Sequence, residues 1–328
     1  CPAKTWLTPQ GQSIPGRSVP EHCHIVGAVA QRLIALYPPA LRSALFPPDA
    51  AFAAACHDIG KVSPSFVEKL RRHCSSGTEH LPQQAIAPEL EKQWGGHAGV
   101  SQAAAKALGA PAWIPEIVGQ HHGFSPQLGG KQADAEVFGG SGWQAQRTAL
   151  VQELQQRLGM SWPQITSAAQ ARLVAGLTSV ADWIGSGRHF EDPTQPWQDL
   201  IDTALSEAGW VAPSYRPELG FADVFGFAPR AAQQQLLEMA HRPGVYVLEA
   251  PMGLGKTEAA LYTAYQMLDR GLASGIYFAL PTQLTSNKIH ERFNAFLSRI
   301  IAPDCPHRSA LLLHGKAWLQ QTDMGEEG

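Results

Sequence analysis

The spacing of apolar residues changes partway along the chain. From about residue 18 to residue 188, apolar positions recur at helical spacing in segments separated by proline and glycine, a pattern typical of successive amphipathic helices. From about residue 245 onward, short apolar runs end in turns and lead into helices, which is the order of a parallel α/β domain. The change predicts an all-α domain over residues 1–215, followed by an incomplete α/β lobe over residues 216–328.

A proline-bearing stretch, residues 191–225, lies between the two regions. It predicts a connector with one short helix near residues 199–208, and we place the domain boundary near Tyr215. A chain of 328 residues and 35.4 kDa also exceeds what a single hydrophobic core usually holds, so two domains are expected.

A histidine–aspartate pair falls at a predicted helix end. Asp49 is a suitable N-cap for a helix over residues 50–56, and Gly60 provides a stop signal. His57 and Asp58 should therefore lie at the carboxyl end of this helix.

Two further predicted helices carry polar residues near their carboxyl ends. Pro115 suits the first turn of a helix that His121 and His122 close. In the last helical segment, the apolar residues that recur at helical spacing place Asp182 close to the buried face; they are Leu173, Leu177, Val180 and Ile184.

The imidazole and carboxylate side chains of the helical region form an ordered series. A helical bundle can bring such side chains to one interior point. Histidine and carboxylate ligands together suit Zn, Mn, Fe, Co or Ni better than Mg or Ca, and a carboxylate between two histidine-rich sets can bridge two ions. Two ions can activate water and neutralise charge on a phosphodiester. The candidates, in chain order, are His22, His57, Asp58, His97, His121, His122 and Asp182.

The first candidate ligand is either His22 or His24, which lie two residues apart. His22 aligns with the apolar stripe of Val26, Val29 and Leu33, whereas His24 aligns with a more polar side of the same predicted helix. The periodicity favours His22.

The strings CHDIGKVSPSF, GGHAGVS, IVGQHHG and GLTSVADWIGS resemble motifs of the HD phosphohydrolase superfamily, and within it the type I CRISPR-associated nuclease-helicases. The resemblance spans most of residues 22–186 and implies an HD-type helical fold. It implies that Asp58 bridges two divalent transition-metal ions and that Lys61 sits beside the scissile phosphate. One ion site would be completed by His22, His57 and Asp182, and the other by His97, His121 and His122. Ser101 and Ser186 match family serines near the site.

The second region contains a phosphate-binding loop. A predicted apolar strand over residues 245–249 leads into APMGLGKT, residues 250–257, and then an Ala- and Leu-rich helix. This is a P-loop with Ala in place of the first Gly. Backbone N–H groups and the helix N-terminus would hold the phosphates of ATP and its Mg²⁺, with contacts from Gly253, Gly255, Lys256 and Thr257.

Other segments of this region resemble superfamily 2 helicases with a RecA-like lobe. Residues 227–233 match the adenine-reading segment, in which Gln233 would contact the base. Residues 279–282 close a second predicted strand and match a segment that contacts the nucleic-acid backbone, and residues 311–316 predict a third strand. No strand that ends in Asp-Glu follows the loop. We therefore expect a partial motor, and a partial chain, since Cys1 takes the place of an initiator Met.

The resemblance implies a metal-dependent nuclease that cleaves single-stranded DNA and is recruited by an RNA-guided CRISPR surveillance complex, with an ATP-driven helicase in the complete protein. One alternative is a module that docks the surveillance complex or an inhibitor protein, with nuclease activity secondary. Another is an HD phosphohydrolase acting on nucleotides.

Composition restricts these expectations only in part. The net charge of −3 provides no overall basic field, so nucleic-acid contacts would come from local clusters such as Lys69, Arg71 and Arg72, which can equally be a solvated helix face. Five cysteines without a Cys-x-x-Cys pair argue against a disulfide framework and favour a reducing cytoplasm. No apolar run is long enough to predict a membrane partner.

Overall fold

The computed structural model describes residues 1–126, 128, 135–280, 283–305 and 310. The chain forms two compact units, one made of Cys1–Leu36 with Arg42–Trp210 and the other of Tyr37–Leu41 with Val211–Gly328. The main division falls between Trp210 and Val211, close to Tyr215, where the sequence predicts the boundary.

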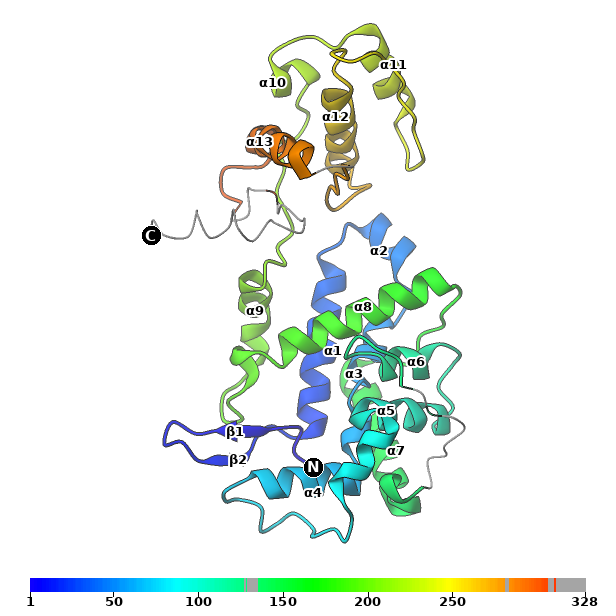
Figure 1. Ribbon diagram of the computed structural model, residues 1–328, viewed down its shortest axis with the longest axis vertical. Coiled ribbons are helices and arrows are strands. Elements are labelled where there is room, and N and C mark those ends of the chain that lie inside the picture. Colours follow the sequence, from blue (N-terminus) through cyan, green and yellow to red (C-terminus); the bar gives the residue numbers. More distant parts are fainter. Residues whose placement is uncertain (127, 129–134, 281–282, 306–309, 311–328) are drawn as a thin grey trace. The chain divides into compact units, whose positions relative to one another are not determined.

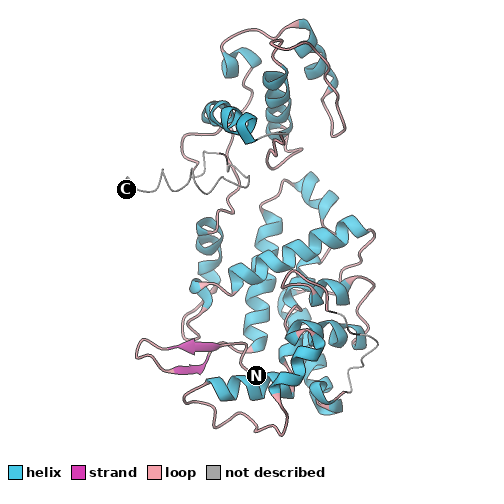
Figure 2. Ribbon diagram, in the orientation of Figure 1, coloured by secondary structure: helices cyan, strands magenta, loops and turns pink. Residues whose placement is uncertain are grey.

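The first unit is built almost entirely of helices (Figures 1 and 2). The sheet among its described residues is an amino-terminal hairpin of β1 (Thr5–Leu7) and β2 (Ser13–Pro15), antiparallel with Trp6 opposite Ile14. The α-helices are α1 (Val19–Ala35), α2 (Pro39–Leu45), which begins in the short segment assigned to the second unit, α3 (Ala50–Ala55), α4 (Pro64–His73), α5 (Gly96–Ala107), α6 (Ile114–Gly119), α7 (Gly140–Leu158), α8 (Ala168–Gly185) and α9 (Ile201–Glu207). The 3₁₀ turns are η1 (Ile59–Lys61), η2 (Pro88–Trp94), η3 (Glu136–Phe138), η4 (Arg188–Phe190) and η5 (Gln198–Leu200).

Helices α1, α3 and α8 pack against one another at the centre of this unit. Close approach depends on small residues. A Cβ at Gly27 of α1 would lie 2.8 Å from the Cβ of Ala55 in α3, and a Cβ at Gly185 of α8 would lie 2.8 Å from Cγ2 of Val26 in α1. All six residues of α3 are buried, so this short helix is held from every side.

The buried face of α8 differs from the predicted one. Leu173 is 39% exposed, and Val180 and Ile184 are only half-buried. The buried positions are mostly small, namely Ala171, Val174, Ala175, Leu177, Thr178, Ala181, Asp182 and Gly185. Of the four predicted apolar positions only Leu177 is buried, because the close packing of α8 on α1 selects mostly small side chains at the contact. Asp182 nevertheless lies on the buried face, as expected.

Asp49 does not cap α3, although the helix begins at Ala50 as predicted. Its backbone is left-handed, with φ 61°, whereas a capping residue is normally extended. The Asp49 carboxylate instead accepts hydrogen bonds from the backbone N–H and the hydroxyl of Ser161, both at 3.1 Å. A contact distant in the sequence therefore replaces the expected local one.

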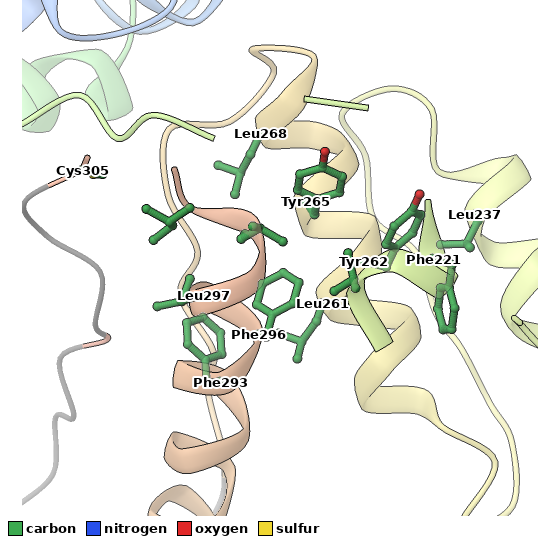
Figure 3. Close-up of a cluster of buried hydrophobic side chains, with 13 residues drawn as sticks. Phe221, Leu237, Leu261, Tyr262, Tyr265, Leu268, Phe293, Phe296, Leu297 and Cys305 are labelled. Carbon is green, nitrogen blue, oxygen red and sulfur yellow. The ribbon is translucent and has the colours of Figure 1, made fainter. Parts of the chain in front are cut away.

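The second unit contains α10 (Phe221–Phe225), α11 (Ala231–Met239), α12 (Lys256–Asp269) and α13 (Gln283–Ile300). Figure 3 shows its core, in which aromatic residues of α12 and α13 pack with Phe221. The hydroxyl of Tyr265 donates to the carbonyl of Arg216 at 2.7 Å, which anchors the chain entering this unit.

The paired sheet predicted for the second unit is not present among the described residues. Residues 245–249 and 276–280 have no strand assignment, yet their burial alternates with a period of two, as in an extended segment with one covered face. Val245 and Tyr277 are 94% and 85% exposed. A strand also needs ladder partners, and neither segment has one in the described ranges. Residues 281–282 and 311–316 lie outside the described residues, so the RecA-like lobe stays a prediction.

All five cysteines are free, consistent with the expected absence of a disulfide framework. Within the described ranges, none of the helices combines the length and apolar character needed to cross a lipid bilayer.

Candidate metal centre

Five segments of the first unit bring their predicted ligands together. His22 comes from α1, and His57 and Asp58 lie in the turn between α3 and η1. The remaining ligands come from the start of α5, the turn after α6, and α8: His97, His121, His122 and Asp182. The helix ends predicted for the two dipeptides are confirmed, because α3 ends at Ala55 and α6 at Gly119.

These side chains form two groups, each with ligand atoms within 4.8 Å of one another. The Asp182 group contains His22, His57, Asp58 and Asp182, and the His122 group contains His97, His121 and His122. The Asp182 group is fully buried, whereas His97 is half-buried and His122 exposed. The centre therefore opens to solvent on the side of the His122 group.

The Asp58 carboxylate lies between the two groups. Its Oδ2 is 3.1 Å from Nε2 of both His22 and His57. Its Oδ1 is 3.5 Å from Nε2 of His97 and 3.7 Å from Nε2 of His121. One oxygen thus faces each group, which is the arrangement of a carboxylate that can bridge two ions.

Backbone carbonyls orient two of the imidazoles. Nδ1 of His57 lies 2.8 Å from the carbonyl of Ala54, and Nδ1 of His121 lies 2.6 Å from the carbonyl of Val118. Because a carbonyl only accepts, each Nδ1 carries the proton, and Nε2 points toward Asp58. Such hydrogen bonds fix the tautomer of a metal-ligating histidine.

Burial and charge determine the protonation of the centre. Burial lowers the pKa of His97 to about 3 and that of His121 to about 4, so both are neutral and suited to bind a metal. Burial also opposes the charge of His57, but Asp58 and Asp182 outweigh it and raise its pKa to about 10. His57 therefore holds a proton between two carboxylates at neutral pH.

The polar atoms at the centre fit a divalent cation. Two buried atoms of the centre, Nε2 of His121 and Oδ1 of Asp58, make no hydrogen bond, and such atoms are costly to bury unpaired. The two atoms lie 3.7 Å apart. A donor set of imidazoles and carboxylates matches a transition metal or zinc, so the His/Asp cluster is suited to divalent metal binding.

Close packing holds the turn that carries Asp58. A Cβ at Gly60 would lie 2.3 Å from both the carbonyl of His97 and the backbone nitrogen of Ser101, so η1 and α5 touch where only glycine fits. The Gly60 N–H donates to the hydroxyl of Ser101 at 2.9 Å. Lys61, at the end of η1, places its Nζ 2.6 Å from Oδ2 of Asp58.

Several supporting contacts were not found by sequence reasoning. Ser186, weighed there only as a family match, donates its hydroxyl to Oδ1 of Asp182 at 2.9 Å, and Lys4 of the amino-terminal segment donates to the carbonyl of Ser186 at 3.0 Å. The buried Arg147 donates to the carbonyl of Val62 at 2.7 Å, just after η1. The Lys4 and Arg147 contacts span long separations along the chain, so no local sequence signal predicts them. The Ser186–Asp182 contact joins residues four apart at the end of α8, and this helical spacing could have indicated it.

His24 lies outside the centre. Its ring packs edge-on against Trp197, with centroids 4.9 Å apart, while His22 is 3% exposed and faces Asp58. The structure thus brings His22, and not His24, to the cluster.

The phosphate-binding loop of the second unit precedes α12. Gly253 and Gly255 have φ values of 80° and 77°, which favour glycine, and the loop is exposed. Lys256 opens α12 and donates to the carbonyl of Ala250 at 2.5 Å, and Thr257 follows it. Gln233 donates to the carbonyl of Gly255 at 2.8 Å and so lies against the loop.

Comparison with known proteins agrees with this site. The family model described as "Cas3, HD domain" matches residues 3–190. The CRISPR-associated nuclease/helicase Cas3 of Streptococcus thermophilus is 31% identical over 323 residues, which cover 82% of this chain and 34% of that protein. The CRISPR-associated endonuclease/helicase Cas3 of Thermus thermophilus is also 31% identical, over 85% of this chain and 34% of its own length.

A solved structure shares the fold. The crystal structure of T. fusca Cas3 superimposes with a TM-score of 0.75 and 25% identity, covering 98% of this chain and 40% of that one. The chain spans about a third of the length of the two curated relatives. Since the family model covers more than half of the chain and includes every member of the His/Asp cluster, the chain belongs to the Cas3 HD-domain family.

Proposed function

We propose that the first unit is a metal-dependent phosphodiesterase that cleaves single-stranded DNA. The observation that carries the proposal is the Asp58 carboxylate, whose two oxygens face two separate groups of ligands. A pair of ions held in this way suits phosphodiester hydrolysis, which needs charge neutralised on both the attacking and the leaving oxygen. The relatives named above carry the names nuclease and helicase.

Each ligand has a defined task in this proposal. His22, His57 and Asp182 would hold one ion, His97, His121 and His122 the other, and Asp58 would bridge them. Bound divalent ions would supply an activated water and neutralise the phosphate. Mn, Fe, Co, Ni or Zn fits this donor set. Ser186 holds the Asp182 carboxylate in place through its hydroxyl.

Lys61 would bind the scissile phosphate. Its side chain is 13% exposed, and burial, which disfavours its charge, is outweighed by Asp58, so its pKa lies above the usual value. The ammonium group is therefore charged, and it would contact a non-bridging phosphate oxygen from its place beside Asp58.

The test is cleavage of a labelled single-stranded oligodeoxynucleotide. Wild-type protein should cut it with Mn²⁺, Co²⁺ or Ni²⁺ and without ATP, and a chelator should stop the reaction. His57→Ala should be inactive while still folded by circular dichroism. A chelator-resistant activity would refute the proposal, and preferential hydrolysis of mononucleotides in the same assay would favour a nucleotide phosphohydrolase.

For the second unit, we propose nucleotide binding at Gly253, Gly255, Lys256 and Thr257, with ATP and Mg²⁺ used in the complete protein. The exposed glycine loop ahead of α12 supports this assignment. We also propose that an RNA-guided surveillance complex recruits the complete protein to DNA, and membership of the Cas3 HD-domain family supports this proposal. Lys256→Ala should leave the cleavage of single-stranded DNA by this chain unchanged, because phosphodiester hydrolysis at the metal centre needs no ATP.

A further inference from the structure

The open side of the metal centre determines where a substrate can enter. His122 is exposed and His97 half-buried, whereas His22, His57 and Asp58 are buried. A DNA strand must therefore approach past the His122 group. The side chains beside His97 on this side are those that can contact the strand next to the scissile phosphate.

Phe66 of α4 connects His97 to two lysines. Its ring centroid lies 5.5 Å from that of His97, 5.5 Å from Nζ of Lys61 and 5.9 Å from Nζ of Lys69. The ring itself is 5% exposed, and its backbone N–H is capped by Ser63. Phe66 and Lys69 are three residues apart on α4 and so share a face of the helix.

Unlike Lys61 and Lys4, Lys69 makes no ion pair among the described residues. Lys61 already pairs with Asp58. Lys4, on the side of Asp182, donates to the Ser186 carbonyl and lies 4.0 Å from a carboxylate oxygen of Glu191. Lys69 is exposed and, among the described residues, has no carboxylate oxygen within ion-pair distance.

The surroundings of Lys69 do not neutralise it. Glu91 is buried, its carboxylate accepts a hydrogen bond from the hydroxyl of Ser65 at 3.3 Å, and it forms no ion pair with Lys69. Glu68 is occupied by two guanidinium groups, since Arg71 and Arg72 both donate to it, at 2.8 and 2.9 Å. One carboxylate against two arginines leaves this part of α4 with excess positive charge.

We propose that Lys69 binds a phosphate of the DNA strand next to the one held at Lys61, so that the centre selects polynucleotides over single phosphodiesters. The inference rests on the proposed nuclease function and adds a residue that distinguishes substrates by their length. Phe66 fixes the spacing of the two ammonium groups because both lie against its ring.

The test compares Lys69→Ala with Lys106→Ala, an exposed lysine at the far end of α5. Two substrates are used with Mn²⁺, a single-stranded oligodeoxynucleotide and bis(p-nitrophenyl) phosphate, which has one phosphodiester. Lys69→Ala should raise KM for the oligonucleotide about five- to ten-fold and lower the slope of log KM against log salt by about 0.7, the value for one phosphate of a single strand. Its effect on the single diester should be much smaller, and Lys69→Arg should restore the salt slope.

Two results would overturn the inference. In the first, Lys69→Ala matches Lys106→Ala on the oligonucleotide. In the second, Lys69→Ala impairs both substrates equally, which would place Lys69 in support of the metal centre itself. If the wild-type protein hydrolyses neither substrate, the nuclease proposal fails, and this result differs from both of the others.

Discussion

Replacing Asp58 with Asn tests whether one carboxylate serves two ions. The substitution keeps the shape of the side chain and removes its charge. Each Asp58 oxygen lies 3.1–3.7 Å from imidazole nitrogens of one ligand group, so both ions would lose the same negative charge. At an effective dielectric constant of ~20, two unit charges about 4 Å apart interact by ~4 kcal/mol. Even after desolvation offsets much of this, we expect each ion to bind at least ~100-fold more weakly, or ~2.7 kcal/mol.

The assay is metal stoichiometry by inductively coupled plasma mass spectrometry after equilibration at fixed free Mn²⁺. Wild-type protein should hold two ions per chain, and Asp58→Asn close to none. Asp182→Asn and His121→Ala are matched controls, because each belongs to one ligand group and should lose one ion. Retention of one tightly bound ion by Asp58→Asn would refute the bridging assignment.

Three further outcomes follow from the geometry. His22→Ala should weaken metal binding in an isothermal titration far more than His24→Ala, since His24 packs on Trp197; the reverse ranking would exclude His22 as the first ligand. Gly60→Ala should lower the free energy of unfolding in urea by about 1–3 kcal/mol, because its Cβ would lie 2.3 Å from backbone atoms. In Gly142→Ala the new Cβ meets nothing within 4 Å, so this control should keep the wild-type stability. Equal losses of stability in the two variants would show that the close contact at Gly60 is not the cause. Because the pKa of His57 is raised to about 10, a metal must displace its proton at neutral pH. Metal binding should therefore release about one proton at the Asp182 group and strengthen as pH rises toward 10. Calorimetry in buffers of different ionisation enthalpy measures the proton release, and metal binding without proton release would contradict the raised pKa of His57.

Local signals explain how the sequence brings the candidate ligands together. Helix α3 ends at Ala55, before Gly60 in η1, and Pro115 stands in the first turn of α6. Short-range signals therefore position the dipeptides that follow these helices. His22 could be chosen over His24 from periodicity alone, since a buried stripe on one helix is also a local property.

Other features depend on contacts that no local pattern encodes. The buried face of α8 is set by how closely α1 approaches Gly185, and the Asp49 side chain is taken by Ser161. The link from Lys4 through Ser186 to Asp182 joins opposite ends of the first unit's sequence. In the second unit, exposed and half-buried residues alternate along residues 245–249, as in a strand. A sheet also requires hydrogen bonds to neighbouring strands, which a local pattern cannot predict.

Anomalous diffraction from crystals soaked in Mn²⁺ tests the metal centre most directly. We expect two anomalous peaks, one on each side of the Asp58 carboxylate, with His22, His57 and Asp182 around one and His97, His121 and His122 around the other. A single peak, or peaks that do not contact Asp58, would contradict the bridging role of Asp58.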